Sequence, residues 1–266
     1  MLRDITIGQY YKTDSILHRL DPRVKLFGTL VFLVSLFMSQ NIWGYLLVTA
    51  FILGAIKLSN VPLKFICKGL KAIVVIILFS VSFTLLFTSG ERVITEFWIF
   101  TITAEGIIKS LEIAVRLILM IIGSSLVTLT TTPNDIADGL EKAFGFLKLI
   151  KVPVHEIAMM VSIAFRFIPI LLEETDKIMK AQTARGASFD EGGIVEKAKS
   201  LVPIIVPLLV SSIKRALDLA TAMEARCYRG GVGRTKMKPL KYKKEDYIAY
   251  VVYGIYVGAA VILVLI

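Results

Sequence analysis

Long apolar stretches alternate with short polar ones through the first half of the chain and again at its end. Five of these stretches are continuous enough to predict membrane-spanning helices, at residues 24–38, 43–56, 72–87, 107–129 and 247–266. The first two are shorter than the ~20 residues that a helix needs to cross the hydrocarbon layer. We therefore expect these two spans to be tilted or to continue beyond the apolar run.

The segment 133–245 has a different pattern, in which apolar residues recur at helical spacing and charged residues take the remaining positions. This pattern predicts three long, amphipathic helices outside the membrane. Proline near the first turn and glycine after the last turn indicate their ends. The predicted helices run from 133 to about 148, from 153 to 185 with a kink at Pro169, and from 194 to 226.

A further membrane span is possible within 201–210, which is almost wholly apolar. A single crossing there would invert the segment that follows and place the basic residues 229–244 on the outer side of the membrane. Basic loops stay preferentially on the cytoplasmic side. We therefore reject this span and expect 133–245 to lie on one side of the membrane.

Composition supports the membrane assignment. The chain has 266 residues, of which 56% are hydrophobic, and its formal net charge is +10. Its mean hydropathy is +0.73, which a soluble core of this size would not need. The basic excess does not require nucleic acid as a partner, because cytoplasmic loops of membrane proteins are rich in Lys and Arg. We predict an all-α polytopic membrane protein with the lipid bilayer, and no nucleic acid, as a partner.

Lysine and arginine are concentrated in segment 1–25 and in loop 57–71, whereas the opposite side carries only Arg92 and Lys109. The positive-inside rule then puts the N-terminus in the cytoplasm, and five spans put the C-terminus outside. An aromatic cluster, 97–100, is expected at the outer membrane surface. The predicted organisation is a cytoplasmic N-terminal segment (1–23), four transmembrane helices (24–132), a cytoplasmic helical domain (133–245) and a C-terminal transmembrane helix (246–266).

Common sequence motifs for nucleotide binding, zinc-dependent hydrolysis and serine hydrolysis are missing from the sequence. There is no GxxxxGK[ST] phosphate loop, no HExxH and no GxSxG. The only cysteines, Cys67 and Cys227, are far apart, and the only histidines are His18 and His155, so neither a disulfide framework nor a metal site is indicated. We expect a protein that is not an enzyme by itself and has no cofactor or metal of its own.

Glu112 and Arg116 are four residues apart in the predicted span 107–129, where they would share one helix face. An ion pair between them would lower the cost of placing charge at membrane depth. Such a pair could serve transport, but we favour a structural pair near the interface, because intramembrane charge relays are rare.

A short pattern occurs twice, Ala-x-x-Ala-Arg followed by a small residue, at 181–186 and at 222–227. Its arginines, Arg185 and Arg226, are 41 positions apart and each lies at a predicted helix end. A single arginine there is ordinarily a partner for the helix dipole. The duplication favours a different interpretation, in which small neighbours let a partner approach and each guanidinium binds a carboxylate bidentately.

These motifs resemble those of the transmembrane T component of energy-coupling factor (ECF) transporters, which take up vitamins and trace-metal ions in prokaryotes. The resemblance covers nearly the whole chain and rests on 17–26 (LHRLDPRVKL), 184–186 (ARG) and 222–231 (AMEARCYRGG). It implies a prokaryotic cell membrane location and a role for the segment 133–245 as coupling helices. It further implies that two ABC-type ATPase subunits, which bind the ATP, dock at Ala184, Arg185, Gly186, Ala225, Arg226 and Cys227.

The resemblance also implies a separate membrane subunit, the S component, which binds the substrate and rests on apolar coupling-helix residues. These are Met159, Met160, Ile163, Leu201, Ile204 and Leu208. One departure is Cys227, where the family pattern more often has glycine, so a glycine-dependent cap is in question there. The implied function is coupling ATP-driven motion to vitamin or micronutrient import. Alternatives are a stand-alone secondary transporter or channel and a membrane-embedded enzyme.

Overall fold

A computed structural model of the chain describes residues 10–39, 41–90, 93–97, 100–146, 152–187, 189, 193–230 and 240–265. The chain divides into two compact units. We call residues 8–139 with 240–266 the bundle unit and residues 140–239 the hairpin unit. Several predicted features include residues outside the described part: 98 and 99 of the aromatic cluster, the end of the first amphipathic helix at 147–148, and the turn at 190–192.

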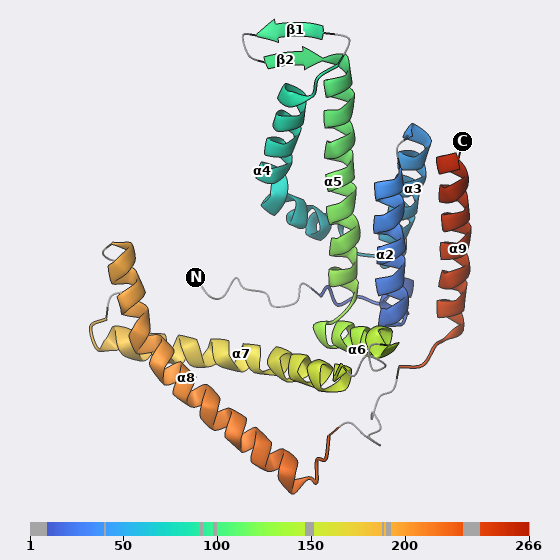
Figure 1. The fold of residues 1–266 in the computed structure, drawn as a ribbon. Coiled ribbons are helices and arrows are strands. Elements are labelled where there is room, and N and C mark those ends of the chain that lie inside the picture. The colour runs from blue at the N-terminus through green and yellow to red at the C-terminus, as the bar shows by residue number, and fades with distance from the viewer. Residues whose placement is uncertain are drawn as a thin grey trace. The chain divides into compact units, whose positions relative to one another are not determined.

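The bundle unit consists of helices with one small hairpin between two of them (Figure 1). Its elements are α1 (Ile16–Arg19), α2 (Pro22–Met38), α3 (Ile42–Ser59), α4 (Leu63–Phe87), β1 (Val93–Phe97), β2 (Phe100–Thr103), α5 (Ala104–Thr130) and α9 (Lys244–Leu265), with α6 (Pro133–Ala143) crossing into the hairpin unit. The five predicted spans coincide with α2, α3, the second part of α4, α5 and α9. The antiparallel pair β1–β2 was not predicted from sequence.

Five helices of the described chain are long and apolar enough to cross a membrane, namely α3, α5, α7 (Val154–Ala184), the part Lys199–Ala225 of α8 (Ile194–Ala225), and α9. A sixth arises if α4 counts as one span, because its segments Leu63–Lys71 and Ile73–Phe87 meet at a bend of 59°. Helix α2 has 17 residues, slightly below the usual length. The class of an all-α polytopic membrane protein is therefore confirmed.

The core of the bundle unit lies where α2, α3, α5 and α9 meet. Its buried residues are Phe32, Leu36, Val48, Ile52, Leu119, Leu126 and Tyr256. Two glycines let neighbouring helices approach: a Cβ at Gly123 would lie 2.3 Å from the Phe32 ring, and one at Gly28 would lie 2.4 Å from Tyr253. Any side chain at either position would push a packed ring away and open the core.

A polar cluster joins the start of α2 to the start of α9. The buried carboxylate of Asp246 accepts the backbone N–H of Asp21 at 2.8 Å and that of Lys243 at 2.7 Å. Asp21 caps α2 and is bound by both Nε and a terminal nitrogen of Arg23, at 3.0 and 2.9 Å. The Arg23 guanidinium in turn lies 4.0 Å from the centre of the Tyr242 ring. Asp21 and Arg23, both within the motif at 17–26, thus hold the start of α2 to the start of α9.

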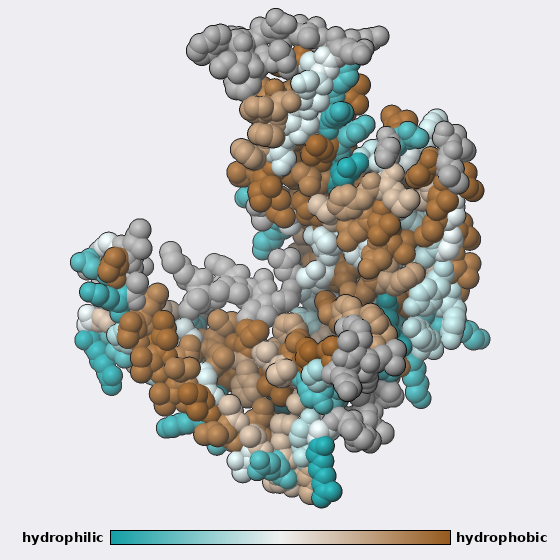
Figure 2. Space-filling model, in the orientation of Figure 1, coloured by the Kyte–Doolittle hydropathy of each residue, from teal (hydrophilic) through white to brown (hydrophobic). Residues whose placement is uncertain are grey.

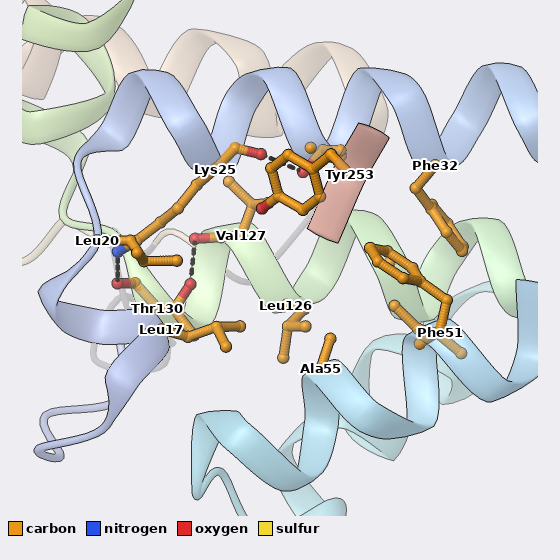
Figure 3. Close-up of a pocket in the computed structure, with 14 residues that line it drawn as sticks. Leu17, Leu20, Lys25, Phe32, Phe51, Ala55, Leu126, Val127, Thr130 and Tyr253 are labelled. Atoms are coloured by element: carbon orange, nitrogen blue, oxygen red, sulfur yellow. Dashed lines mark hydrogen bonds between the residues drawn. The ribbon is translucent and has the colours of Figure 1, made fainter. Parts of the chain in front are cut away.

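Lys25 connects the start of α2 to the end of α5. Its ammonium group donates to the backbone oxygen of Thr130 at 2.9 Å and to that of His18 at 3.3 Å. Figure 3 shows this side chain reaching toward Thr130 along the edge of a small, mainly apolar cavity of about 60 Å³. A cation at the carboxyl end of a helix binds carbonyls that have no partner within the helix. Lys25 therefore fixes the end of α5 beside the start of α2.

These contacts place the end of α5 and the starts of α2 and α9 on the same side of the bundle. The chain between Thr130 and Asp246 therefore leaves and re-enters the bundle on one side. Any membrane crossing in this connection must then be balanced by a second one.

Replacing Asp246 by alanine should destabilise the protein, because the N–H groups of Asp21 and Lys243 would lose their acceptor. We expect the free energy of unfolding to fall by roughly 2–3 kcal/mol, the cost of leaving buried donors unpaired. Asp246→Asn, which keeps an acceptor oxygen, should lose less. Unfolding in mixed micelles would measure both, and an alanine variant as stable as the parent would refute the role given to this carboxylate.

Candidate functional site

The hairpin unit is built from two helices of nearly equal length, α7 with 31 residues and α8 with 32. Each is about 45–48 Å long at 1.5 Å per residue. They pair in opposite directions (Figure 1), since Glu174 accepts from Arg215 at 2.9 Å and Gln182 donates to the backbone oxygen of Pro203 at 3.4 Å. Their carboxyl ends therefore lie at opposite ends of the pair.

Helix α7 ends at the first arginine motif. Arg185 is the C-cap residue, and Gly186 follows with φ +90°. The N–H of Gly186 donates to Thr183 O at 2.9 Å, and the N–H of Ala187 donates to Gln182 O at 3.0 Å. This pair of bonds is the Schellman motif, which closes a helix by turning one residue into the left-handed conformation. The predicted glycine cap is confirmed here.

Helix α8 ends in the same way, position for position. Arg226 is the C-cap residue, and Cys227 follows with φ +57°. The N–H of Cys227 donates to Glu224 O at 2.9 Å, and the N–H of Tyr228 donates to Met223 O at 3.0 Å. A cysteine therefore forms the cap that usually requires glycine, at a conformational cost of roughly 1–2 kcal/mol. The repeated sequence pattern thus encodes a repeated local structure.

Both arginines are exposed and available to a partner. Among the residues that the structure describes, no hydrogen bond or ion pair involves either guanidinium. The flanking residues are exposed and small: Ala184, Gly186, Ala225 and Cys227. The cap fixes the backbone that carries each arginine, while the small neighbours leave room around it. This arrangement suits bidentate binding of a carboxylate within a groove.

Relieving the strain at Cys227 should stabilise the second cap. We expect Cys227→Gly to raise the free energy of unfolding by up to about 1 kcal/mol, since glycine adopts positive φ without the Cβ clash. Cys227→Val should have the opposite effect, because a branched side chain tolerates this conformation least. Thermal unfolding of both variants in detergent would test this, and equal midpoints would show that the cap does not depend on residue 227.

The apolar residues predicted to contact an S component lie on the same two helices. Met160 and Leu201 are exposed, and Met159, Ile163 and Leu208 are half-buried. Ile204 differs from the prediction because only 5% of its surface is exposed, so it packs within the chain and is not available to a separate subunit. Figure 2 shows apolar surface along α8. Besides Leu201, the exposed large apolar side chains of this helix are Val195, Val202, Ile205, Val206, Leu209, Val210, Ile213 and Leu217.

The predicted ion pair between Glu112 and Arg116 is wrong. Arg116 donates to the Tyr45 hydroxyl at 2.7 Å and to the backbone oxygen of Ser39 at 3.3 Å, and no salt bridge joins it to Glu112 in the described chain. Arg116 therefore binds Tyr45 of α3 and not Glu112, which lies four residues away on the same helix. Arg116 fastens α5 to the α2–α3 turn.

The remaining residues with side chains suited to catalysis or metal binding do not form a site in the described part of the chain. No group of three or more His, Cys, Asp or Glu side chains that could hold a metal ion occurs among the described residues. His155, in the first turn of α7, binds Glu141 of α6 at 2.9 Å. Cys67 and Cys227 are both free thiols. The arginine caps are thus the strongest candidate site in the hairpin unit.

Known proteins resemble this chain over almost its full length. The family model CbiQ, described as a cobalt transport protein, matches residues 13–238. The "Energy-coupling factor transporter transmembrane protein EcfT" of Ruminiclostridium cellulolyticum is 50% identical over 246 residues, 92% of each chain. The protein of that name from Clostridium kluyveri is 50% identical, over 94% of this chain and 93% of the relative. The one from Bacillus subtilis is 45% identical, over 92% of this chain and 93% of the relative. The chain therefore belongs to the CbiQ family, among the transmembrane proteins of energy-coupling factor transporters.

Proposed function

We propose that this chain is the coupling subunit of an ABC-type importer for vitamins or other micronutrients. It transmits the ATP-driven motion of two cytoplasmic ATPases to a separate membrane subunit that binds the substrate. The observation that carries this proposal is the pair of matching caps, each presenting an exposed arginine at the end of a long helix. The names of the relatives, which describe one component of a multi-part transporter, support it.

The proposal places residues 133–245 and the N-terminus in the cytoplasm and the C-terminus outside. The connection from α5 to α9 begins and ends beside Asp21 and Lys25, which agrees with an even number of crossings. We take that number as zero, because Arg166 lies within the apolar part of α7, both helices carry several charges outside their apolar parts, and both contain internal prolines. The arginines would then lie on the side where ATP is available.

Each ATPase would bind one arginine, with Arg185 and Arg226 paired to carboxylates in two separate grooves. Because the helices run in opposite directions, the two arginines occupy opposite ends of one hairpin. A relative movement of the ATPases would therefore act on both ends of a single element. The Glu174–Arg215 ion pair ties the helices together between these ends, so the hairpin would move as a coupled pair.

The S component would rest on the apolar side of this hairpin. An apolar surface of this extent is rare on monomers and marks a protein or membrane contact. Met160 and Leu201, with the exposed residues of α8, would provide it. Movement of the hairpin would then tilt or release the S component and its substrate. ATP would be bound only by the partner ATPases, which is consistent with the missing phosphate loop.

Purification of the tagged chain from native membranes tests the proposal as a whole. We expect two ABC-type ATPase chains and a small membrane protein to accompany it in fixed proportion, and ATP-dependent uptake to require all of them. The alternative of a stand-alone secondary transporter or channel predicts substrate movement by the purified chain alone in liposomes. That result, without any ATPase, would exclude the coupling role.

A further inference from the structure

The first segment of α4 carries a compact group of lysines. Lys64, Lys68 and Lys71 are spaced i, i+4 and i+7, which places them within roughly 60° of arc on one helix face. All three are exposed. Segment 56–90 contains no Asp or Glu, and none of these lysines has an ion pair within the described chain. Three cations thus share one surface without a neutralising partner.

The segment lies at the level of the last turns of α5. Ile66 packs in one buried cluster with Leu129, and a Cβ at Gly69 would lie 3.0 Å from Ser125 Oγ. The 27 residues of α5 extend about 40 Å, whereas the hydrocarbon layer is only ~30 Å thick and the headgroups bring the total to ~40–45 Å. Helix α5 is therefore longer than the hydrocarbon layer, and the lysines beside its last turns indicate that this end lies in the headgroup layer.

The direction and composition of the first segment of α4 agree with a position in the headgroup layer. It meets the membrane-spanning remainder of α4 at 59°, and Figure 1 shows it running crosswise to α5. Besides the lysines it exposes Leu63 and Phe65. A short helix with apolar side chains on some faces and lysines on another is suited to lie at a membrane surface, with its ammonium groups among the lipid phosphates.

We propose that Lys64, Lys68 and Lys71 form a binding site for the phosphate groups of anionic phospholipids, in the leaflet that surrounds the end of α5. Each lysine near an anionic surface contributes about fivefold to the binding constant. Because Ile66 and Gly69 of the same segment pack on α5, a bound lipid would hold the bend of α4 against the bundle. The site lies outside the hairpin unit and is independent of the arginine caps.

The test uses the purified full-length chain in uncharged detergent and phosphatidylglycerol with a fluorescent acyl chain, measured by anisotropy. The variant K64Q/K68Q/K71Q should bind at least tenfold more weakly than the parent. The variant K64R/K68R/K71R, which keeps the charges, should bind like the parent. The control K177Q/K180Q/K214Q removes three exposed lysines from the hairpin unit and should also bind like the parent. Fluorescent phosphatidylcholine should bind none of them with comparable affinity.

Several results would overturn this assignment. Equal losses in the two glutamine triples would mean that net charge alone attracts the lipid, and no loss in either would mean that the lysines are not involved. Displacement of the lipid by an equal concentration of inorganic phosphate would indicate a site for a soluble anion. Displacement by an equal concentration of poly-glutamate would indicate an acidic protein as the partner. Matching thermal unfolding midpoints would establish that each variant is folded.

Discussion

Reversing both cap charges, in Arg185→Glu with Arg226→Glu, should abolish co-purification of the ATPases and ATP-dependent uptake. Each substitution would place a carboxylate against the carboxylate that the arginine binds. Losing one partner of a hydrogen-bonded charge pair at an interface costs roughly 2–5 kcal/mol, which is about 30-fold to several-thousand-fold in affinity at each cap. The backbone of both caps and the membrane bundle should be unaffected, so the chain should insert normally.

The matched control for this experiment is Arg166→Glu, which reverses an exposed arginine within α7 away from either cap. It should retain both ATPases. Single variants at Arg185 and Arg226 should each lose one of the two contacts and show intermediate losses. A double variant that assembled and transported like the parent would show that the arginines do not connect the chain to the ATPases.

Placing a charge on the apolar surface of the hairpin should remove the S component and leave the ATPases bound. Met160→Lys and Leu201→Lys each put an ammonium group where the proposed interface is dry. Burying a charge without a partner costs several kcal/mol, so we expect the amount of co-purified S component to fall at least tenfold. Uptake should fall in parallel. Quantitative mass spectrometry of the purified complexes would measure both sets of subunits.

Val195→Lys provides the control, because Val195 is an exposed aliphatic residue in the first turn of α8, before its long apolar run. This variant should keep the S component. If Met160→Lys and Leu201→Lys also kept it, the substrate-binding subunit would have to rest elsewhere on the chain. Loss of the ATPases in the same variants would instead indicate that the hairpin itself had been disrupted.

Features that depend on neighbouring residues could be predicted from the sequence. The apolar runs located α2, α3, α5 and α9, and glycine after Arg185 located the end of α7. The prediction was incomplete at α4, whose helix begins at Leu63, because the lysines between Leu63 and Lys71 break the apolar run. The charge of these lysines indicates the orientation of the chain, and their helical spacing already places them on one face.

Features that depend on distant residues could not be predicted. Nothing near Asp21 indicates that Asp246 lies beside it, and the spacing of Glu112 and Arg116 favoured a pair that Tyr45 prevents by binding Arg116. The apolar pattern of α8 marked Ile204 as a contact residue, yet periodicity does not reveal which face of an apolar helix is covered. Because Cys227 stands where the family pattern more often has glycine, the sequence put a helix cap at this position in doubt. The structure contains the cap, at a modest cost in backbone strain.

Photo-crosslinking at the caps tests the central claim most directly. A photoreactive amino acid at Ala184 or Ala225, both exposed beside the arginines, leaves each guanidinium intact. We predict that each position crosslinks to an ATPase subunit in membranes, whereas the same probe at Val210, on the exposed apolar part of α8, crosslinks to the S component or lipid. Crosslinks from Ala184 and Ala225 to lipid or to the S component, with none to an ATPase, would contradict the account.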